Sequence, residues 1–155
     1  MSFIAPAPAE SIETRPIRNT DFFPDLYLAA TRDAVRLDGT VSDSRLRDAL
    51  ITAMLSVNKA LVGWKQKQLA AGFKTIADVP AETIDNTSEF VLNYRRAVYC
   101  TAAANLNEKL KNFDSTAKGR TQAEQLNDPI DDHRRDAHWA INDILGIGRT
   151  TIELI

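Results

Sequence analysis

The fold is decided by residues 42–72, which read SDSRLRDALITAMLSVNKALVGWKQKQLAAG. Apolar side chains recur along this stretch at spacings of three and four residues, which is typical of one face of an α-helix. Ser42 is a suitable N-cap, and Gly72 suits the left-handed position that terminates a helix. The stretch predicts a helix over residues 43–71, about 43 Å long at 1.5 Å per residue. Its apolar face consists of Leu46, Leu50, Ala53, Met54, Val57, Leu61 and Trp64.

A second long helix is predicted over residues 87–113, and it supplies a partner of similar length. Asn86 followed three residues later by Glu89 resembles a capping box, in which two side chains satisfy the free amides at a helix start. Residues 73–86 connect the two helices, so we expect them to pack antiparallel as a hairpin. This hairpin is the backbone of the expected fold, an all-α helical bundle. The apolar positions of the second helix are Phe90, Tyr94, Val98, Ala102, Leu106, Leu110 and Phe113.

Two shorter helices are predicted on either side of the hairpin. One lies within residues 24–37, and the Asp38-Gly39 pair that follows is a stop signal. The other starts where Asp128 can act as N-cap and Pro129 occupies the first helical position, and it runs over residues 129–145 until Gly146 ends it. The apolar positions of the first of these helices are Leu26, Ala29, Ala30, Ala34 and Leu37.

Both ends of the chain are expected to be extended arms. Residues 1–20 contain three prolines and no apolar period, which is typical of a flexible N-terminal arm. Residues 148–155 read GRTTIELI, in which β-branched and polar residues alternate as in a short strand. Such a strand has no partner in an all-α domain, so it either folds back onto the bundle or pairs with another chain. The expected helical domain therefore spans residues 21–147.

The composition of the chain narrows its function class. Its 155 residues are 44% apolar and 26% charged, which is ordinary for one globular domain. The net charge of −2 gives no overall basic field for non-specific binding to nucleic acid. No stretch has the length and apolarity of a signal peptide core or a membrane span, so no membrane partner is expected. The single cysteine, Cys100, is expected to be a small buried hydrophobe.

The expected C-terminal helix carries a cluster that resembles a metal site by residue type alone. Its two histidines are five residues apart, about 140° around a helix, so their rings do not converge on one ion. Ion pairs with Arg134 and Arg135 are the better explanation of the neighbouring carboxylates. We therefore expect no metal, no other cofactor and no catalytic residue, and the chain is predicted not to be an enzyme. The cluster consists of Asp131, Asp132, His133, Asp136 and His138.

Charged residues in the middle of the chain fall into two consecutive blocks. The basic block has no acidic residue between residues 59 and 74, and the acidic block has no basic residue between residues 75 and 89. Such blocks suit stacking between copies of the chain, and a solvated surface is the alternative explanation. The basic block is Lys59, Lys65, Lys67 and Lys74, and the acidic block is Asp78, Glu82, Asp85 and Glu89. A further basic cluster, a candidate phosphate contact, is Lys109, Lys111, Lys118 and Arg120.

Four segments, taken in their order and spacing, resemble one protein family. They are DGTVSDSRLRDALITAMLSVNKAL at 38–61, ADVPAETID at 77–85, YRRAVYCTAAANL at 94–106 and DDHRRDAHWAINDILG at 131–146. The stretch TRDAVRLDGT at 31–40 looks like the opening of phage head–tail connector proteins. Together the segments are similar to the family of the head completion/stabilisation protein L of tailed temperate myophages. The resemblance runs from about Asp21 to the end of the chain and leaves out residues 1–20.

This resemblance implies a structural virion protein that is made in the host cytoplasm and joins the DNA-filled head at its portal vertex. The implied partners are the portal protein, neighbouring copies of the chain in a ring expected to be twelvefold, and tail-side connector or tail terminator proteins. Packaged DNA in the channel is a further candidate partner. The residue pattern fits this picture, because arms and opposite charge blocks suit the head-to-tail contacts that close into rings.

The expected contact residues lie in the C-terminal arm and in the two basic clusters. They are Arg149, Thr151, Ile152, Leu154, Ile155, Lys65, Lys67, Lys109 and Lys111. A small helical nucleic-acid-binding or interaction module is the alternative function, but the net charge of −2 and the lack of a recognition helix after a tight turn argue against nucleic-acid binding. An enzyme built in a helical bundle needs inward-facing ligands such as Glu-x-x-His pairs, which the sequence lacks.

Overall fold

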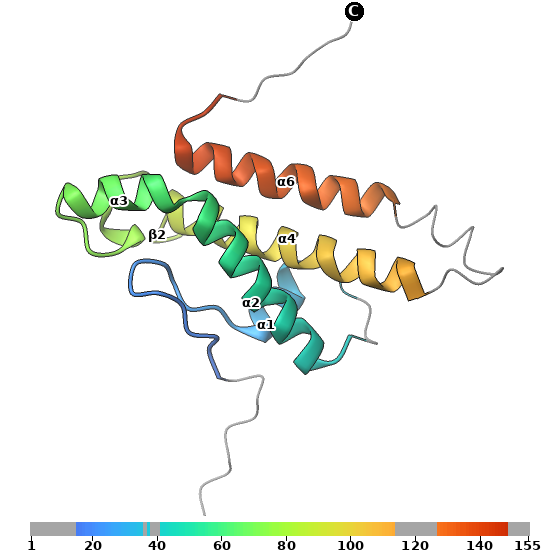
Figure 1. Cartoon of the computed structure of the whole chain (residues 1–155). Helices are drawn as coiled ribbons and strands as arrows, with labels where there is room; N and C mark the ends of the chain where they lie inside the picture. Colours follow the sequence, from blue (N-terminus) through green and yellow to red (C-terminus); the bar gives the residue numbers. More distant parts are fainter. Residues whose placement is uncertain (1–14, 36, 38–40, 114–126, 149–155) are drawn as a thin grey trace, which may run out of the picture.

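The computed structural model describes residues 15–35, 37, 41–113 and 127–148, and this part of the chain is a helical bundle, as predicted (Figure 1). One 3-10 turn and one small β-hairpin are its additional regular elements. In chain order the elements are α1 (Leu28–Ala34), α2 (Asp43–Ala60), α3 (Val62–Ala70), η1 (Ile76–Asp78), β1 (Thr83–Ile84), β2 (Thr87–Ser88), α4 (Glu89–Phe113) and α6 (Asn127–Leu145). No helix among the described residues has both the length and the apolar character needed to cross a membrane.

Helix α4 is the centre of the bundle. It packs against α2, as predicted for the two long helices, but its most extensive contact is with α6, which runs antiparallel beside it (Figure 1). Between Ala97 and Ala104 every α4 side chain except Thr101 is buried. A helix that is apolar nearly all round is buried on several sides, whereas the sequence analysis assigned α4 a single apolar face. Helix α4 is therefore the packing partner of both α2 and α6, and the bundle is not built on a single dominant hairpin.

The predicted single helix over residues 43–71 is wrong, because the helix is interrupted at Leu61. There the backbone angles are φ −95° and ψ 3°, and α3 leaves at a different direction from α2 (Figure 1). The change of direction brings the Trp64 ring to Phe22 and Phe90, with centroid distances of 6.0 and 5.2 Å. Apolar spacing continues through the interruption, which is why periodicity alone did not indicate it.

The predicted helix ends are mostly confirmed. The Ser42 hydroxyl accepts a hydrogen bond from the Arg45 amide at 3.4 Å. Gly72 and Gly146 adopt φ values of +98° and +71°, the left-handed region in which glycine is favoured after a helix. The last helix begins at Asn127, two residues before the predicted position, which is within the usual spread of helix boundaries.

The predicted capping box at Asn86 and Glu89 is wrong, because Asn86 belongs to a tight turn. Asp85 and Asn86 have φ values of 50° and 56°, and they join β1 to β2 as the two-residue loop of an antiparallel hairpin. Helix α4 starts directly after the hairpin, where the Ser88 hydroxyl accepts a hydrogen bond from the Phe90 amide at 3.3 Å. Asparagine and aspartate are common both in such turns and as N-caps, so residue type alone did not separate the two structures.

The helix before α2 is shorter than predicted, and the segment that contains it packs more closely against the bundle than expected. Helix α1 covers Leu28–Ala34, and it buries Leu28 and Thr31, whereas the expected apolar positions Ala29, Ala30 and Ala34 are exposed. Residues 15–20 fall in the expected N-terminal arm, but from Ile17 onward the chain lies against the bundle. Residues 1–14 and 149–155, with the rest of both expected arms, lie outside the described residues.

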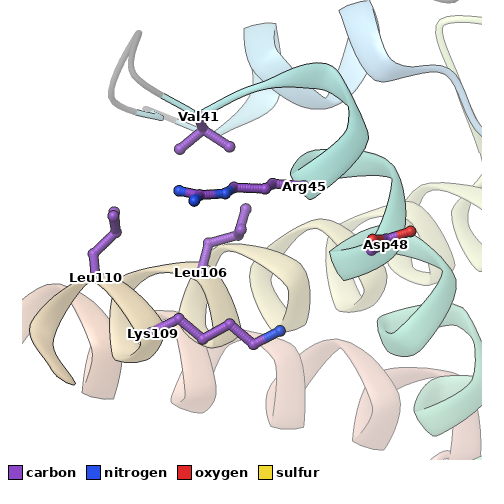
Figure 2. A pocket seen from close by; sticks show the side chains of 6 residues that line it. All are labelled: Val41, Arg45, Asp48, Leu106, Lys109 and Leu110. Atoms are coloured by element: carbon purple, nitrogen blue, oxygen red, sulfur yellow. The ribbon is translucent and has the colours of Figure 1, made fainter. Parts of the chain in front are cut away.

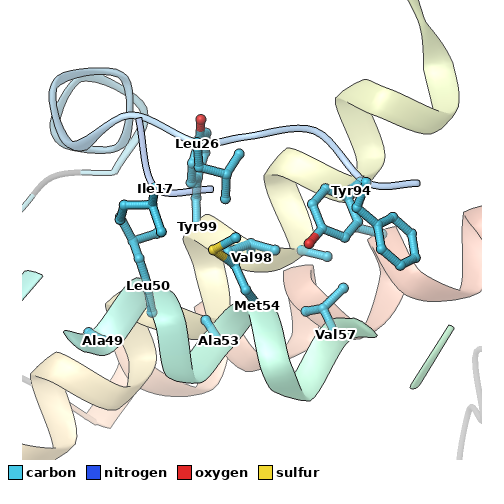
Figure 3. Close-up of a cluster of buried hydrophobic side chains, with 14 of the residues drawn as sticks. Ile17, Leu26, Ala49, Leu50, Ala53, Met54, Val57, Tyr94, Val98 and Tyr99 are labelled. Atoms are coloured by element: carbon cyan, nitrogen blue, oxygen red, sulfur yellow. The ribbon is translucent and has the colours of Figure 1, made fainter. Parts of the chain in front are cut away.

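Ile17 is the first buried residue of the described chain. Its amide donates to the Leu26 carbonyl at 2.6 Å, and the Leu26 amide donates back at 3.1 Å. Figure 3 shows this extended segment crossing over α2, with Ile17 above Leu50. Both Ile17 and Leu26 are at most 2% exposed and belong to the main core. The N-terminal segment is thus a third layer over the α2 and α4 pair.

Candidate functional site

The α6 carboxylates Asp132 and Asp136 form ion pairs with Arg135, as predicted, whereas Arg134 pairs with a different helix. Arg135 lies 2.7 Å from an oxygen of Asp132 and 3.5 Å from one of Asp136. Asp136 also faces Arg96 of α4 at 3.4 Å, and Arg134 pairs with Glu108 of α4. These last two pairs tie α6 to the central helix. Within the described residues, no three His, Cys, Asp or Glu side chains are grouped so that they could hold a metal ion.

Cys100 is buried on α4, as expected, with 8% of its surface exposed. Burial raises the pKa of its thiol, the negative charge of Asp136 raises the pKa further, and Arg96 opposes these effects. A thiol with a raised pKa carries little thiolate at neutral pH, and the thiolate is the nucleophile. This side chain is therefore a packing residue.

Three side chains, of which Tyr94 is buried and the other two are half-buried, form a closed set of hydrogen bonds. The Asn19 amide donates to the Tyr94 hydroxyl at 2.7 Å, the hydroxyl donates to the Asn58 carbonyl at 2.7 Å, and the Asn58 amide donates back to Asn19 at 3.0 Å. Burial raises the pKa of Tyr94 to about 12, although the hydrogen bond from Asn19 lowers it. This network joins the N-terminal segment to α2 and α4.

Lys109 lines a hollow of about 190 Å³ between the start of α2 and the second half of α4. Figure 2 shows the Arg45 side chain lying between Val41 and Leu106, with the Lys109 side chain on the neighbouring turn of α4. The hollow is smaller than the sites that enclose small molecules, which are typically about 300–1,000 Å³. Lys111, the next member of the predicted cluster, is half-buried at the end of α4, and Lys118 and Arg120 lie outside the described residues.

The basic block runs from the last turn of α2 through α3 to Lys74, and the acidic block runs from η1 through the hairpin to the start of α4 (Figure 1). Lys65 is half-buried, and its ammonium lies 5.9 and 5.6 Å from the ring centroids of Phe22 and Phe23. Lys67 is exposed. In the part of the chain that the structure describes, no ion pair involves any member of either block. Neighbouring charges of opposite sign thus remain available for contacts outside the molecule.

An exposed apolar stripe runs along α2 and α3, and the sequence analysis missed it. It consists of Ile51, Leu55, Val62 and Leu69, which are 40%, 68%, 49% and 45% exposed. Its spacings of four, seven and seven residues are also helical, so the signal was present as a second apolar face beside the buried one. The C-terminal contact residues that we predicted, Arg149, Thr151, Ile152, Leu154 and Ile155, lie outside the described residues.

The fold and this surface define a class of protein. The described part is a helical bundle with a packed hydrophobic core. Its surface carries hollows, exposed apolar side chains, and charged side chains without ion-pair partners among the described residues. These are the features of a subunit that acts by contact with other macromolecules.

Comparison with known proteins identifies the family, and the chain belongs to the phage head completion proteins (GPL), whose family model matches residues 17–155. It is 40% identical over 139 residues to the head completion/stabilization protein of Escherichia phage P2, an alignment that covers 90% of this chain and 82% of that protein. No solved structure matches. The resemblance noted in the sequence is therefore confirmed, and the chain is a structural protein that completes phage heads. The matched region begins at Ile17, the first buried residue of the described chain.

Proposed function

We propose that the chain completes the head at the portal vertex, where it retains packaged DNA and forms part of the head–tail connector. The observation that carries this proposal is the family match, which spans the whole described bundle and continues to residue 155. A filled head needs closure at the opening through which its DNA entered. A protein that completes heads therefore acts at that opening, and in the virion it stays there.

The proposed assembly is a ring of copies that follows the symmetry of the portal, with twelve copies expected. The features that support a ring are the exposed stripe on α2 and α3 and the two charge blocks, which form no ion pair within the described residues. Different patches that meet head to tail close into rings. The portal protein lies on one side of this ring, and a tail-side connector or tail terminator protein lies on the other. Lys109 and Arg45 are candidate contacts to DNA in the channel.

The experiment uses DNA-filled heads that were produced without this protein. These heads are incubated with and without the purified chain, treated with DNase and sedimented. We expect the chain to sediment with the heads and to protect their DNA. Unprotected DNA together with an unbound chain contradicts the proposal. An added tail preparation tests the connector role, since protected heads should then form infectious particles.

The C-terminal segment is the proposed contact to the portal or to the neighbouring copy. We expect deletion of residues 149–155 to abolish attachment to heads, because this segment alternates apolar and polar residues as an added strand does. The helical signal in circular dichroism should not change, since α6 ends at Leu145, before the deleted residues. A truncated chain that protects DNA as well as the full chain contradicts this assignment.

A further inference from the structure

The tip of the β-hairpin presents one apolar side chain between negative charges. Ile84 is 64% exposed, and it is the one large apolar residue of the hairpin over residues 83–88. Glu82 and Asp85 on either side of it are exposed and have no ion-pair partner among the described residues. Strands of two residues gain little stability from their own pairing, and an exposed isoleucine adds none. Ile84 is therefore free to contact another molecule.

A hollow beside the stripe has apolar side chains in its lining and positive charges at its edge. It measures about 260 Å³, lies between residues 17–20 and α2, and has Ile51, Met54 and Leu55 in its lining. Arg18 also lines it, and Lys59 follows Leu55 by one helical turn. Both cations are exposed and form no ion pair in the described part of the chain. We call this feature the α2 hollow.

We propose that the hairpin of one copy docks on the next copy, with Ile84 in the α2 hollow and with Glu82 and Asp85 facing Arg18 and Lys59. The contact rests on the proposed function, since it supplies the interface between neighbouring copies in the assembled ring. The hollow holds one aliphatic side chain, and the exposed apolar residues beyond it continue on α2 and then on α3 as far as Leu69.

The hairpin suits this contact because its turn fixes its shape in advance. Asp85 and Asn86 both adopt positive φ, as in the two-residue turns whose twist matches that of the paired strands. A tip that is ordered before binding loses little conformational freedom on docking. The hairpin and the hollow are different patches of one chain, so the contact is head-to-tail and every copy can bind two neighbours.

Cysteine cross-linking in completed heads tests the contact directly. Leu55→Cys and Ile84→Cys are introduced together in a Cys100→Ala background, heads are completed with this variant, and a mild oxidant is added. A denaturing gel without reductant should show a ladder of oligomers beyond the dimer, because each copy supplies both cysteines. The matched control replaces Ile84→Cys with Asp33→Cys on the exposed side of α1, and it should remain monomeric.

The outcomes separate this inference from the proposed function. Unprotected DNA with the unmodified chain contradicts the proposed function itself. Protected DNA with only monomers on the gel overturns the docking contact and leaves the function standing. A ladder that stops at the dimer also overturns it, because a two-fold symmetric contact would then join the copies. An equal ladder from the Asp33→Cys control overturns it as well.

Charge reversal tests the same contact without cross-linking. Arg18→Glu with Lys59→Glu should lower the fraction of protected heads at least about tenfold, because like charges then face each other across the contact. Glu82→Lys with Asp85→Asn in the same chain should restore protection. The matched control, Arg47→Glu with Arg95→Glu, reverses two cations that lie outside the basic clusters and do not line the hollow. Unchanged protection in the first variant, or an equal loss in the control, overturns the contact.

Discussion

Tyr94 shows how one side chain fixes a part of the chain that is distant in sequence. Its ring is fully buried and stacks on Phe23 at a centroid distance of 4.6 Å, and its hydroxyl joins Asn19 to Asn58. No buried side-chain nitrogen or oxygen of the described residues lacks a partner. The hydroxyl thus contributes both a donor and an acceptor between two half-buried side chains.

Replacement of Tyr94 by phenylalanine should lower the free energy of unfolding by about 0.5–1.5 kcal/mol, because the half-buried Asn58 carbonyl then loses its donor. Urea denaturation followed by circular dichroism measures the change. Tyr27→Phe is the matched control, since Tyr27 is 46% exposed, and it should change the value by less than about 0.5 kcal/mol. Equal effects of the two substitutions contradict the role of the network.

The same hydroxyl makes stability depend on pH at alkaline values. Burial raises the pKa of Tyr94 to about 12 in the folded chain, against about 10 when unfolded. Below pH 10 both states hold the proton, and the stabilisation is complete. As the pH rises from 10 towards 12 the unfolded state loses the proton first, so stability falls by up to about 1.4 kcal/mol per pH unit. Urea titrations between pH 8 and 11 should show a shallower fall in Tyr94→Phe, and parallel curves would contradict this assignment.

Composition and spacing predicted whether individual residues are buried or ion-paired. They did not predict which distant residues hydrogen-bond to each other. The buried state of Cys100 and the ion pairs of Arg135 followed from residue type and helical spacing. The Asn19–Asn58–Tyr94 network did not, because its members are 39 and 36 residues apart in sequence and no local pattern connects them. Side-chain networks of this kind depend on how elements pack, which a periodicity argument does not supply.

At the scale of elements, the sequence predicted where helices exist but not every point at which they stop. The second long helix, the last helix and the glycine ends at Gly72 and Gly146 are present, whereas residues 43–70 form two helices instead of one. The interruption at Leu61 was missed, because Leu61 is fully buried and keeps the apolar spacing intact. The hairpin was missed because its strands contain two residues each, too few to show alternation.

Two glycines, one inside α3 and one just after it, should respond in opposite ways to alanine. Gly63 lies inside the helix, has no positive φ and is surrounded by open space where a methyl group would stand, so Gly63→Ala should raise the free energy of unfolding by about 0.5–1 kcal/mol. Gly72 has φ +98°, so Gly72→Ala should lower it by about 1 kcal/mol or more. Urea denaturation of both variants measures the difference. A loss of stability in Gly63→Ala would contradict the helical geometry at that position.

At the scale of the whole molecule, the buried core and the family match begin at the same residue. Ile17 is 2% exposed, and the family model matches from residue 17. The exposed charge blocks were predicted from sequence, but the α2 hollow was not. It exists only because residues 17–20 cross α2 about thirty positions away, where Ile51 and Leu55 lie. A hollow formed by two segments that are distant in sequence cannot be predicted from the sequence pattern of either segment alone.

Removal of residues 1–14 should leave both the fold and the function intact. The chain that starts at Arg15 keeps the Ile17 and Leu26 pairing and the whole matched region. We expect an unchanged free energy of unfolding within about 0.5 kcal/mol and full protection of DNA in filled heads. Ile17→Asp in the same truncated chain is the contrasting variant, and it should be destabilised because it buries an unpaired charge. Lost protection by the truncated chain alone would assign a role to residues 1–14.

The central position of α4 also governs the order in which the protein can fold during its synthesis. Helix α2 leaves the ribosome before α4, and the side of α4 that contacts α6 stays uncovered until residues 127–145 have been made. At about 5–20 residues per second, the nascent chain exposes these apolar surfaces for several seconds. The α4 side of the core therefore closes only near the end of translation, when the last described helix has been made.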